Sequence, residues 1–147
     1  MTISYIGSTL AVVASAPAAE DASSYAALSY TTVGQVISIG ELGDTNEDIA
    51  FDRLADGRKV HVNGVKDLGD IAVELDYDRD DAGLTIIEAG EGSNTTHSFK
   101  IEDSDGDVYY FQAIISNFRT TERRPSQYKA VQFVMRGRSG VTKVDGS

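Results

Sequence analysis

The chain has 147 residues, a formal net charge of −10 and no cysteine. This length predicts one domain with a core of its own. The missing cysteine excludes disulfides, thiolate catalysis and cysteine-bound metals, and the negative charge argues against a nucleic-acid grip built from basic residues.

The first thirty residues combine an apolar run with an alanine- and serine-rich stretch. Residues 10–19 look like the core of an export signal, but residues 1–8 lack the Lys or Arg that begins such signals. The apolar run is also too short to span a bilayer, so we expect no membrane association. We expect a first strand over residues 3–13 and a loop over residues 14–29.

A long acidic segment follows a β-branched one. Residues 32–39 predict a strand, and residues 41–57 predict a long loop of the kind that is usually functional or disordered. Within it, Ile49, Phe51 and Leu54 either anchor the loop on its own domain or dock on a partner subunit.

Two turn signals bracket the next predicted strand. Asp56-Gly57 is the first and Asn63-Gly64 is the second, and both are dipeptides typical of tight hairpin turns. Residues 58–62 between them predict a short strand.

Residues 69–78 alternate between apolar and acidic side chains. This is the period of a strand with one buried face and one wet face. The apolar positions are Ile71, Val73, Leu75 and Tyr77, and the acidic positions are Asp70, Glu74, Asp76 and Asp78. We therefore expect a strand whose wet face carries almost nothing but carboxylates.

A short amphipathic helix is predicted directly after this strand, over about residues 80–90. Asp80 or Asp81 can accept the unpaired N–H groups of its first turn. Leu84 begins an apolar stripe, and Gly90 is a plausible stop.

The last third of the chain predicts a hairpin and one long strand. Residues 98–102 and 108–116 flank an Asp-Gly turn, and residues 126–138 alternate over a long final strand. The segment between them, residues 117–125, is basic, with Arg119, Arg123 and Arg124. We expect a loose tail over about residues 139–147.

Metal binding and catalysis have little support. Asp76, Asp78 and Asp80 begin like a calcium loop, but Asp81 stands where that loop needs glycine, and its twelfth position is Ile87. The Asp-rich turn at residues 103–107 offers weak calcium binding at most. No nucleophile elbow or phosphate loop is present, so we expect no metal, no cofactor and no enzymatic activity.

In their order, these segments resemble the tail tube protein (major tail protein) of long-tailed bacteriophages. The resemblance rests on ISYIGSTL, VGQVISIGELG, LADGRKVHVNGVKDLGDIAVELDYDRDDAG and FKIEDSDGDVYYFQAIISNF, followed by the long last strand. The resemblance covers about residues 3–137 and is weakest over residues 13–29.

The resemblance implies a single mainly β domain over residues 1–147, a β-sandwich or barrel-like tail-tube fold with one short helix. Its inner strands would join a shared barrel in a hexameric ring, and rings would stack into a hollow tube that conducts genomic DNA. The implied partners are further copies, together with tail terminator, tape measure and distal tail proteins. The implied place is the virion tail, assembled in the host cytoplasm.

Two sets of residues fit such a tube on their charges. Carboxylates facing a channel repel phosphates, so DNA would pass without specific binding; the expected lumen-lining residues are Asp70, Glu74, Asp76 and Asp78. Stacked rings need complementary faces. The expected inter-ring contact sets Asp44, Glu47, Asp48, Ile49, Phe51 and Asp52 against Arg119, Arg123 and Arg124.

Two other function classes stay open. The Asp clusters allow a calcium-dependent adhesion or carbohydrate-binding β-module. Paired carboxylates would also suit a glycosidase, although the absence of tryptophan counts against a sugar-binding cleft.

Overall fold

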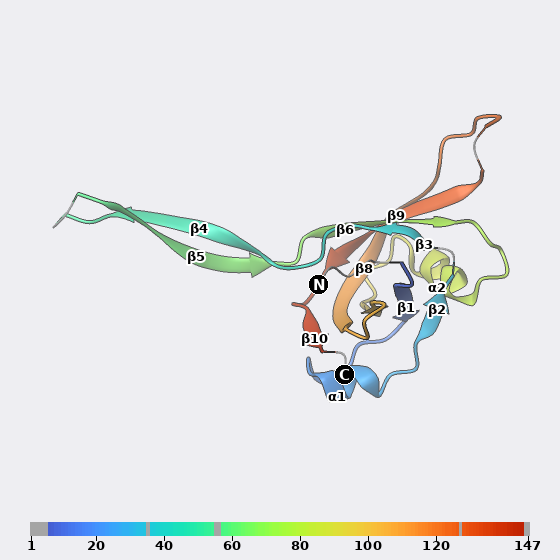
Figure 1. The fold of residues 1–147 in the computed structure, drawn as a ribbon, viewed down its shortest axis with the longest axis horizontal. Helices are drawn as coiled ribbons and strands as arrows, with labels where there is room; N and C mark the ends of the chain where they lie inside the picture. The colour runs from blue at the N-terminus through green and yellow to red at the C-terminus, as the bar shows by residue number, and fades with distance from the viewer. Residues whose placement is uncertain (1–5, 35, 55–56, 127, 146–147) are drawn as a thin grey trace.

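The computed structural model describes residues 6–34, 36–54, 57–126 and 128–145. Figure 1 shows a body of antiparallel strands with two helices, and a two-stranded arm that projects far from it. The mainly β, sandwich or barrel-like fold predicted from the sequence is confirmed. No helix within the described ranges is long and apolar enough to cross a membrane.

The body is one sheet of eight strands with the order β2-β1-β7-β8-β9-β6-β3, and β10 also pairs with β8. These strands are β1 (Thr9–Val13), β2 (Thr31–Val33), β3 (Val36–Ile39), β6 (Asp70–Asp76), β7 (His97–Glu102), β8 (Val108–Thr120), β9 (Ala130–Gly137) and β10 (Thr142–Val144). The helices are α1 (Ala22–Ala26) and α2 (Ala82–Gly90), and the arm is β4 (Thr45–Asp52) with β5 (Lys59–Asp67).

β8 joins the two halves of the sheet. Its first part pairs with β7, and its second part, from Ala113 onward, pairs with β9. The register shifts between Ser116 and Arg119, where Asn117 has a φ of 55°. A bulge of this kind bends a strand, so the two halves can enclose one core.

The core fills the space between these halves and α2. Phe99 of β7 stacks on Phe111 of β8 with ring centroids 5.5 Å apart. The side chains of β6, β9 and α2 that complete it are Ile71, Val73, Leu75, Val131, Phe133, Met135, Leu84 and Ile87, all buried. The alternation predicted for β6 is confirmed, because its apolar positions face this core and its acidic positions face away.

α2 is fixed at its start by one carboxylate. Asp81 is the N-cap and accepts a hydrogen bond from the Gly83 N–H at 3.0 Å. The same side chain accepts one from the Gly34 N–H at 2.9 Å, which ties the helix to the chain after β2. The predicted helix is confirmed, although Gly90 is its last residue and the chain turns at Gly92, whose φ is 75°.

Gly83→Ala should destabilise the protein by about 1–3 kcal/mol, the usual cost of overpacking. A Cβ at Gly83 would lie 2.8 Å from the Thr32 carbonyl oxygen and 2.8 Å from Val33 Cα. Because these are backbone atoms, the helix must shift. Chemical denaturation measures the loss. The exposed Glu88→Ala on the same helix is the control, with a change within about 0.5 kcal/mol; equal effects would contradict the close packing.

The N-terminal part differs from the prediction in three places. β1 begins at Thr9, and residues 3–5 of the predicted strand lie outside the described residues. The strand predicted over residues 32–39 is two strands, β2 and β3, in different places in the sheet. The predicted loop contains α1, whose N-cap Asp21 accepts from the Ser24 N–H at 2.8 Å. The alanine- and serine-rich composition around it hides so short a helix.

The C-terminal tail also differs from the prediction. Residues 142–144 form β10 along β8 rather than a loose end. Lys143 supports the pairing, with its Nζ 3.8 Å from Asp107 and 5.9 Å from the Tyr109 ring centroid. Composition alone gave no sign of this strand because its partners come from another part of the chain.

The predicted loop over residues 41–57 is largely the strand β4. It pairs with β5, so the segment is one side of a hairpin. The turn lies between Arg53 and Arg58, where the Arg53 N–H donates to the Arg58 carbonyl at 3.0 Å. Asn63-Gly64 is not a turn but part of β5, opposite a register shift between Asn46 and Asp48. Gly64 instead leaves room for the side chain of Ile49, because a Cβ at Gly64 would lie 2.9 Å from Ile49 Cδ1.

Three tyrosines hold α1 against β8. Tyr25 is fully buried and stacks on Tyr110 with centroids 5.2 Å apart, and its hydroxyl accepts from Gln112 Nε2 at 3.3 Å. The ring centroid of Tyr30 lies 6.0 Å from that of Tyr110. Its hydroxyl is buried and has no hydrogen-bond partner among the described residues. Burial, and then the nearby Tyr110 and Tyr25, raise the pKa of Tyr30 well above its ordinary value.

Tyr30→Phe should stabilise the protein by ~1 kcal/mol at neutral pH, because it removes an unsatisfied buried hydroxyl. It should also flatten the alkaline limb of the stability curve. A raised folded-state pKa gives stability that is full below about pH 10 and is lost as the pH rises further. Melting curves from neutral to alkaline pH measure both effects. Tyr25→Phe should destabilise the protein, because the Tyr25 hydroxyl is hydrogen-bonded. The same response in both variants would contradict the conclusion that the Tyr30 hydroxyl is buried without a partner.

Candidate functional site

The outward face of β6 carries the predicted acidic row. Asp70, Glu74 and Asp76 alternate with the buried apolar residues of the same strand and therefore share its other face. Asp78 lies past the end of β6, in the turn before α2, where its carboxylate accepts from the Asp80 N–H at 3.0 Å. Three of the four expected lumen residues thus lie on one sheet face.

The neighbouring strands modify this row. Asp70 lies opposite Arg136 of β9, and Arg136 Nε is 3.8 Å from its carboxylate. Both side chains are about half exposed or more, so the pair contributes little to stability. Glu74 lies between Ser38 of β3 and Gln132 of β9, both neutral. The middle of the row is therefore uncompensated negative charge, whereas its end at Asp70 is partly neutralised. Sequence reasoning missed Arg136, because only the register brings it opposite Asp70.

Asp76 occupies the other end of the row in a tighter setting. It pairs in register with Ala130 of β9. One of its oxygens, Oδ1, is buried and has no hydrogen-bond partner among the described residues. A buried oxygen without a hydrogen bond costs free energy of folding, so Asp76 carries on this face a cost that the more exposed Asp70 does not.

The arm has two chemically different faces. Ile49 lies opposite Val62, and Phe51 lies opposite Val60. Their apolar side chains share one face, and Ile49, Phe51 and Val62 are each 46–49% exposed. The other face is polar: His61 Nδ1 is 2.9 Å from the Asp48 carboxylate. Sequence reasoning singled out Ile49 and Phe51, but only the pairing of the strands places the valines of β5 beside them.

The arm also has an acidic and a basic strand. β4 carries Glu47, Asp48 and Asp52. β5 carries the basic residues Lys59 and Lys66, together with His61. Asp44, expected to take part in the same contact, precedes β4 at the root of the arm, near Gly140, so it lies apart from the other acids of the arm.

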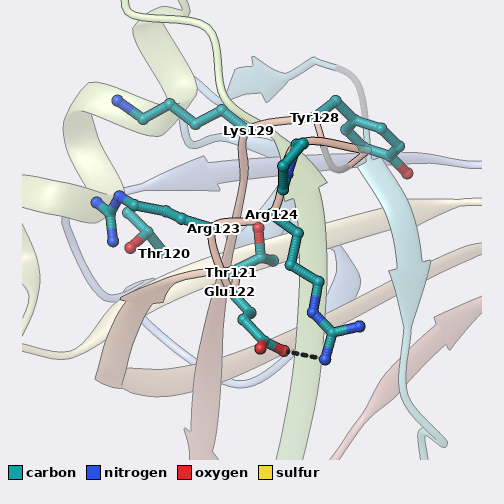
Figure 2. A pocket seen from close by; sticks show the side chains of 8 residues that line it. Thr120, Thr121, Glu122, Arg123, Arg124, Tyr128 and Lys129 are labelled. Carbon is teal, nitrogen blue, oxygen red and sulfur yellow. Dashed lines mark ion pairs between the residues drawn. The ribbon is translucent and has the colours of Figure 1, made fainter.

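A basic pocket lies in the loop between β8 and β9. It has a volume of about 390 Å³ and is lined by Thr120, Thr121, Arg123, Arg124, Tyr128 and Lys129, together with Glu122 and Pro125. Figure 2 shows Arg123 and Arg124 pointing in different directions, with the Arg124 guanidinium paired to Glu122 at 3.0 Å. The Lys129 Nζ lies 4.0 Å from the centroid of the Tyr77 ring.

The chain does not bring the acidic arm and the basic pocket together within one molecule. In Figure 1 the arm leaves one end of the body and the β8–β9 loop leaves the opposite end. Arg119 belongs to β8, opposite Gln132, just before the pocket. Tyr128 and Lys129 were not expected there, because sequence reasoning assigned them to the last strand, which begins only at Ala130.

Hydrogen bonds hold the carboxylates of the Asp-rich turn at residues 103–107. Asp103 accepts from the Ser8 hydroxyl at 3.1 Å, and Asp105 accepts from the Asp107 N–H at 3.1 Å. No group of three His, Cys, Asp or Glu residues in the described ranges is arranged to hold a metal ion. The chemistry of the surface is therefore that of charged and apolar patches.

Comparisons with known proteins give structural relatives only. No protein-family model matches the sequence, and no curated protein matches it. Among solved structures, a chain from the tail of an empty GTA particle, refined with C6 symmetry, has a TM-score of 0.63 at 9% identity, over 81% of this chain and 89% of that one. GTA stands for gene transfer agent. This chain has the tail-tube fold.

Two further structural relatives come from other particles. One is a chain from the sheath/tube terminator of PVC, an extracellular contractile injection system, with a TM-score of 0.67 at 8% identity over 99% of this chain and 98% of that one. The other comes from the six-fold symmetrised baseplate of the anti-feeding prophage, with a TM-score of 0.68 at 7% identity over 98% and 95%. Both span nearly the whole chain, including the arm.

Proposed function

We propose that this chain is a structural subunit of a phage tail tube, without enzymatic activity. Six copies form a ring, rings stack into a hollow tube, and genomic DNA passes through the lumen. The observation that carries the proposal is the acidic row on the outward face of β6 in a chain with the tail-tube fold. The six-fold symmetry of the assemblies that contain two of the relatives supports the ring size.

The acidic row suits a channel for DNA. Glu74 and Asp76, with Asp70 at the end, repel phosphates when repeated around a ring. Repulsion from all sides keeps a polyanion centred and mobile. Asp78, in the turn beyond β6, extends the same charge toward one rim.

The arm and the basic pocket suit the contact between rings. Head-to-tail stacking requires two different complementary surfaces on one subunit, and these two lie at opposite ends of the body. Glu47, Asp48 and Asp52 of β4 would face Arg123 and Arg124 of the next ring. Arg119, Asp44, Ile49 and Phe51 are further members of the proposed contact.

The place of the protein follows from this role. The tube belongs to the virion tail and is assembled in the host cytoplasm. Its ends meet a tail terminator and distal tail proteins, and a tape measure protein occupies the lumen during assembly. The relatives from a terminator and a baseplate support contacts of this kind.

Electron microscopy of the purified protein over a concentration series tests the proposal. The expected result is rings that stack into hollow tubes as the concentration rises. A monomer at every concentration would contradict it. If the protein instead melts at a higher temperature with calcium and at a lower one with a chelator, the calcium-dependent β-module replaces the tube subunit.

A further inference from the structure

Two arginines share the outward face of β6 with the acidic row, and Arg136 of β9 is the first of them. Arg136 lies directly opposite Asp70, and side chains opposite each other in a sheet point to the same face. The next residue back along β9, Met135, is buried in the core, so Arg136 faces away from the core as Asp70 does. The proposed lumen wall therefore carries positive charge as well as negative charge.

Arg119 of β8 reaches the same face because of the bulge in that strand. β8 shifts register after Ser116, and Arg119 then lies opposite Gln132 of β9. Gln132 in turn lies opposite Glu74 of β6, so these side chains form one row across the sheet, whereas Phe118 packs against the core. Two strand spacings separate Arg119 from Glu74, which is roughly 10 Å. Arg119 has no ion-pair partner among the described residues.

The ion pair of Arg136 with Asp70 is loose. Arg136 Nε lies 3.8 Å from the Asp70 carboxylate, which is longer than a hydrogen bond, and about half of the Arg136 side chain is exposed. A guanidinium group binds phosphate oxygens through several N–H donors and is weakly hydrated. Asp70 therefore lowers the affinity of Arg136 for a phosphate without occupying its donors.

The charges on this face nearly balance. Within β3, β6, β9 and the second half of β8, three carboxylates share the face with two guanidinium groups, which leaves one net negative charge per chain. Repeated around a ring, this excess still repels a polyanion on average. The arginines provide separate points at which a phosphate can touch the wall.

We infer that Arg119 and Arg136 are the residues through which the lumen wall contacts DNA phosphates, and that the carboxylates of β6 keep these contacts weak. Asp70 acts on Arg136 beside it, and Glu74 acts on Arg119 in the same row. Contacts to phosphate carry no sequence preference, as a conduit for a whole genome requires. This inference rests on the proposed function, because it needs this face to border the lumen. Arg119 then lies on the lumen side of the ring contact.

Neutralising one carboxylate tests the inference. Tubes of the Asp70→Asn variant are assembled with a short labelled duplex and treated with nuclease, and the protected duplex is measured from about 50 to 200 mM salt. At the low end we expect at least about tenfold more protected duplex than in tubes of the unaltered chain, because even two phosphate contacts change the affinity about tenfold over this range. Adding Arg136→Gln should return protection to the level of the unaltered chain.

Matched controls separate the local contact from the overall charge of the tube. Glu102→Gln removes a carboxylate 3.9 Å from Lys100 Nζ on β7, in the other half of the sheet, and should leave protection unchanged. Asp70→Asn with Lys100→Gln has the same net charge as Asp70→Asn with Arg136→Gln but keeps Arg136, so it should keep the gain.

Glu74→Gln with and without Arg119→Gln forms an independent second comparison. The first variant should gain protection and the second should lose that gain, with a salt dependence shallower by about one for each phosphate contact removed. This comparison decides the inference if Asp70→Asn does not assemble. Failure of both carboxylate variants to assemble, while Glu102→Gln forms tubes, would overturn the inference, because these carboxylates would then serve assembly.

The remaining outcomes distinguish this inference from the proposed function. A gain that Lys100→Gln removes as fully as Arg136→Gln does, or an equal gain from Glu102→Gln, would overturn the inference. Well-formed tubes in which neither carboxylate variant gains protection would also overturn it and leave the tube subunit intact. If the unaltered chain forms no tubes by microscopy, the proposed function is contradicted, and the inference falls with it.

Discussion

Tubes built from the Asp70→Lys, Glu74→Lys variant should trap double-stranded DNA that tubes of the unaltered chain leave in solution. Two lysines per subunit, repeated around every ring, would replace repulsion of phosphates with a continuous cationic lining. The affinity of such a lining for DNA falls steeply as the salt concentration rises. For six to ten phosphate contacts the loss is roughly a thousandfold or more between 50 and 200 mM salt.

Nuclease protection measures this effect. The protein is polymerised with a short duplex, treated with nuclease, and the surviving DNA is quantified across a salt series. Glu88→Lys, Glu91→Lys is the matched control, because it makes the same charge change on exposed residues at the end of α2, away from the face of β6. DNA protected equally by both variants, or by neither, would count against an acidic lumen.

The Arg123→Glu, Arg124→Glu variant should fold normally but fail to elongate into tubes. The acidic strand β4 would then meet glutamates across the ring interface, and like-charge contacts at an interface cost on the order of several kcal/mol. The variant should still fold, because both side chains of the ion pair between Arg124 and Glu122 are exposed and such a pair contributes little to stability.

Negative-stain microscopy and a melting curve measure the two halves of this prediction. Arg79→Glu, Arg138→Glu makes the same charge change outside the basic pocket and should leave elongation intact. Adding Asp48→Lys and Asp52→Lys to the Arg123 and Arg124 variant should restore tubes by reversing the other surface. Tubes of normal length from the first variant would defeat the proposed ring contact.

The elements predicted from the sequence are those decided by local pattern. β6 alternates with period two, Asp81 caps α2, and an Asp-Gly turn joins β7 to β8; in each case the residues that fix the structure lie within a few positions of one another. The arm was missed although β4 also alternates, with Ile49 and Phe51 two residues apart. Its acidic composition outweighed that signal, and the turn predicted at Asn63-Gly64 ended the partner strand before its last residues.

The candidate surfaces could not be predicted from the sequence alone, because they depend on the register of the strands and on where each strand ends. Sequence alone gave the acidic residues of β6, but not that Asp78 lies beyond the strand, nor that Arg136 stands opposite Asp70. Likewise, the basic segment was recognisable, but its pocket depends on where β8 and β9 end. α1 escaped notice because Tyr25 is held by Tyr110, 85 positions further along the chain, through stacking.

A cryo-electron microscopy reconstruction of the assembled protein tests the central claim most directly. The account predicts stacked rings in which the outward face of β6 borders an enclosed channel, with Glu74 and Asp76 nearest its axis. A reconstruction that puts these carboxylates on the exterior of the tube, with a different strand around the channel, would contradict it.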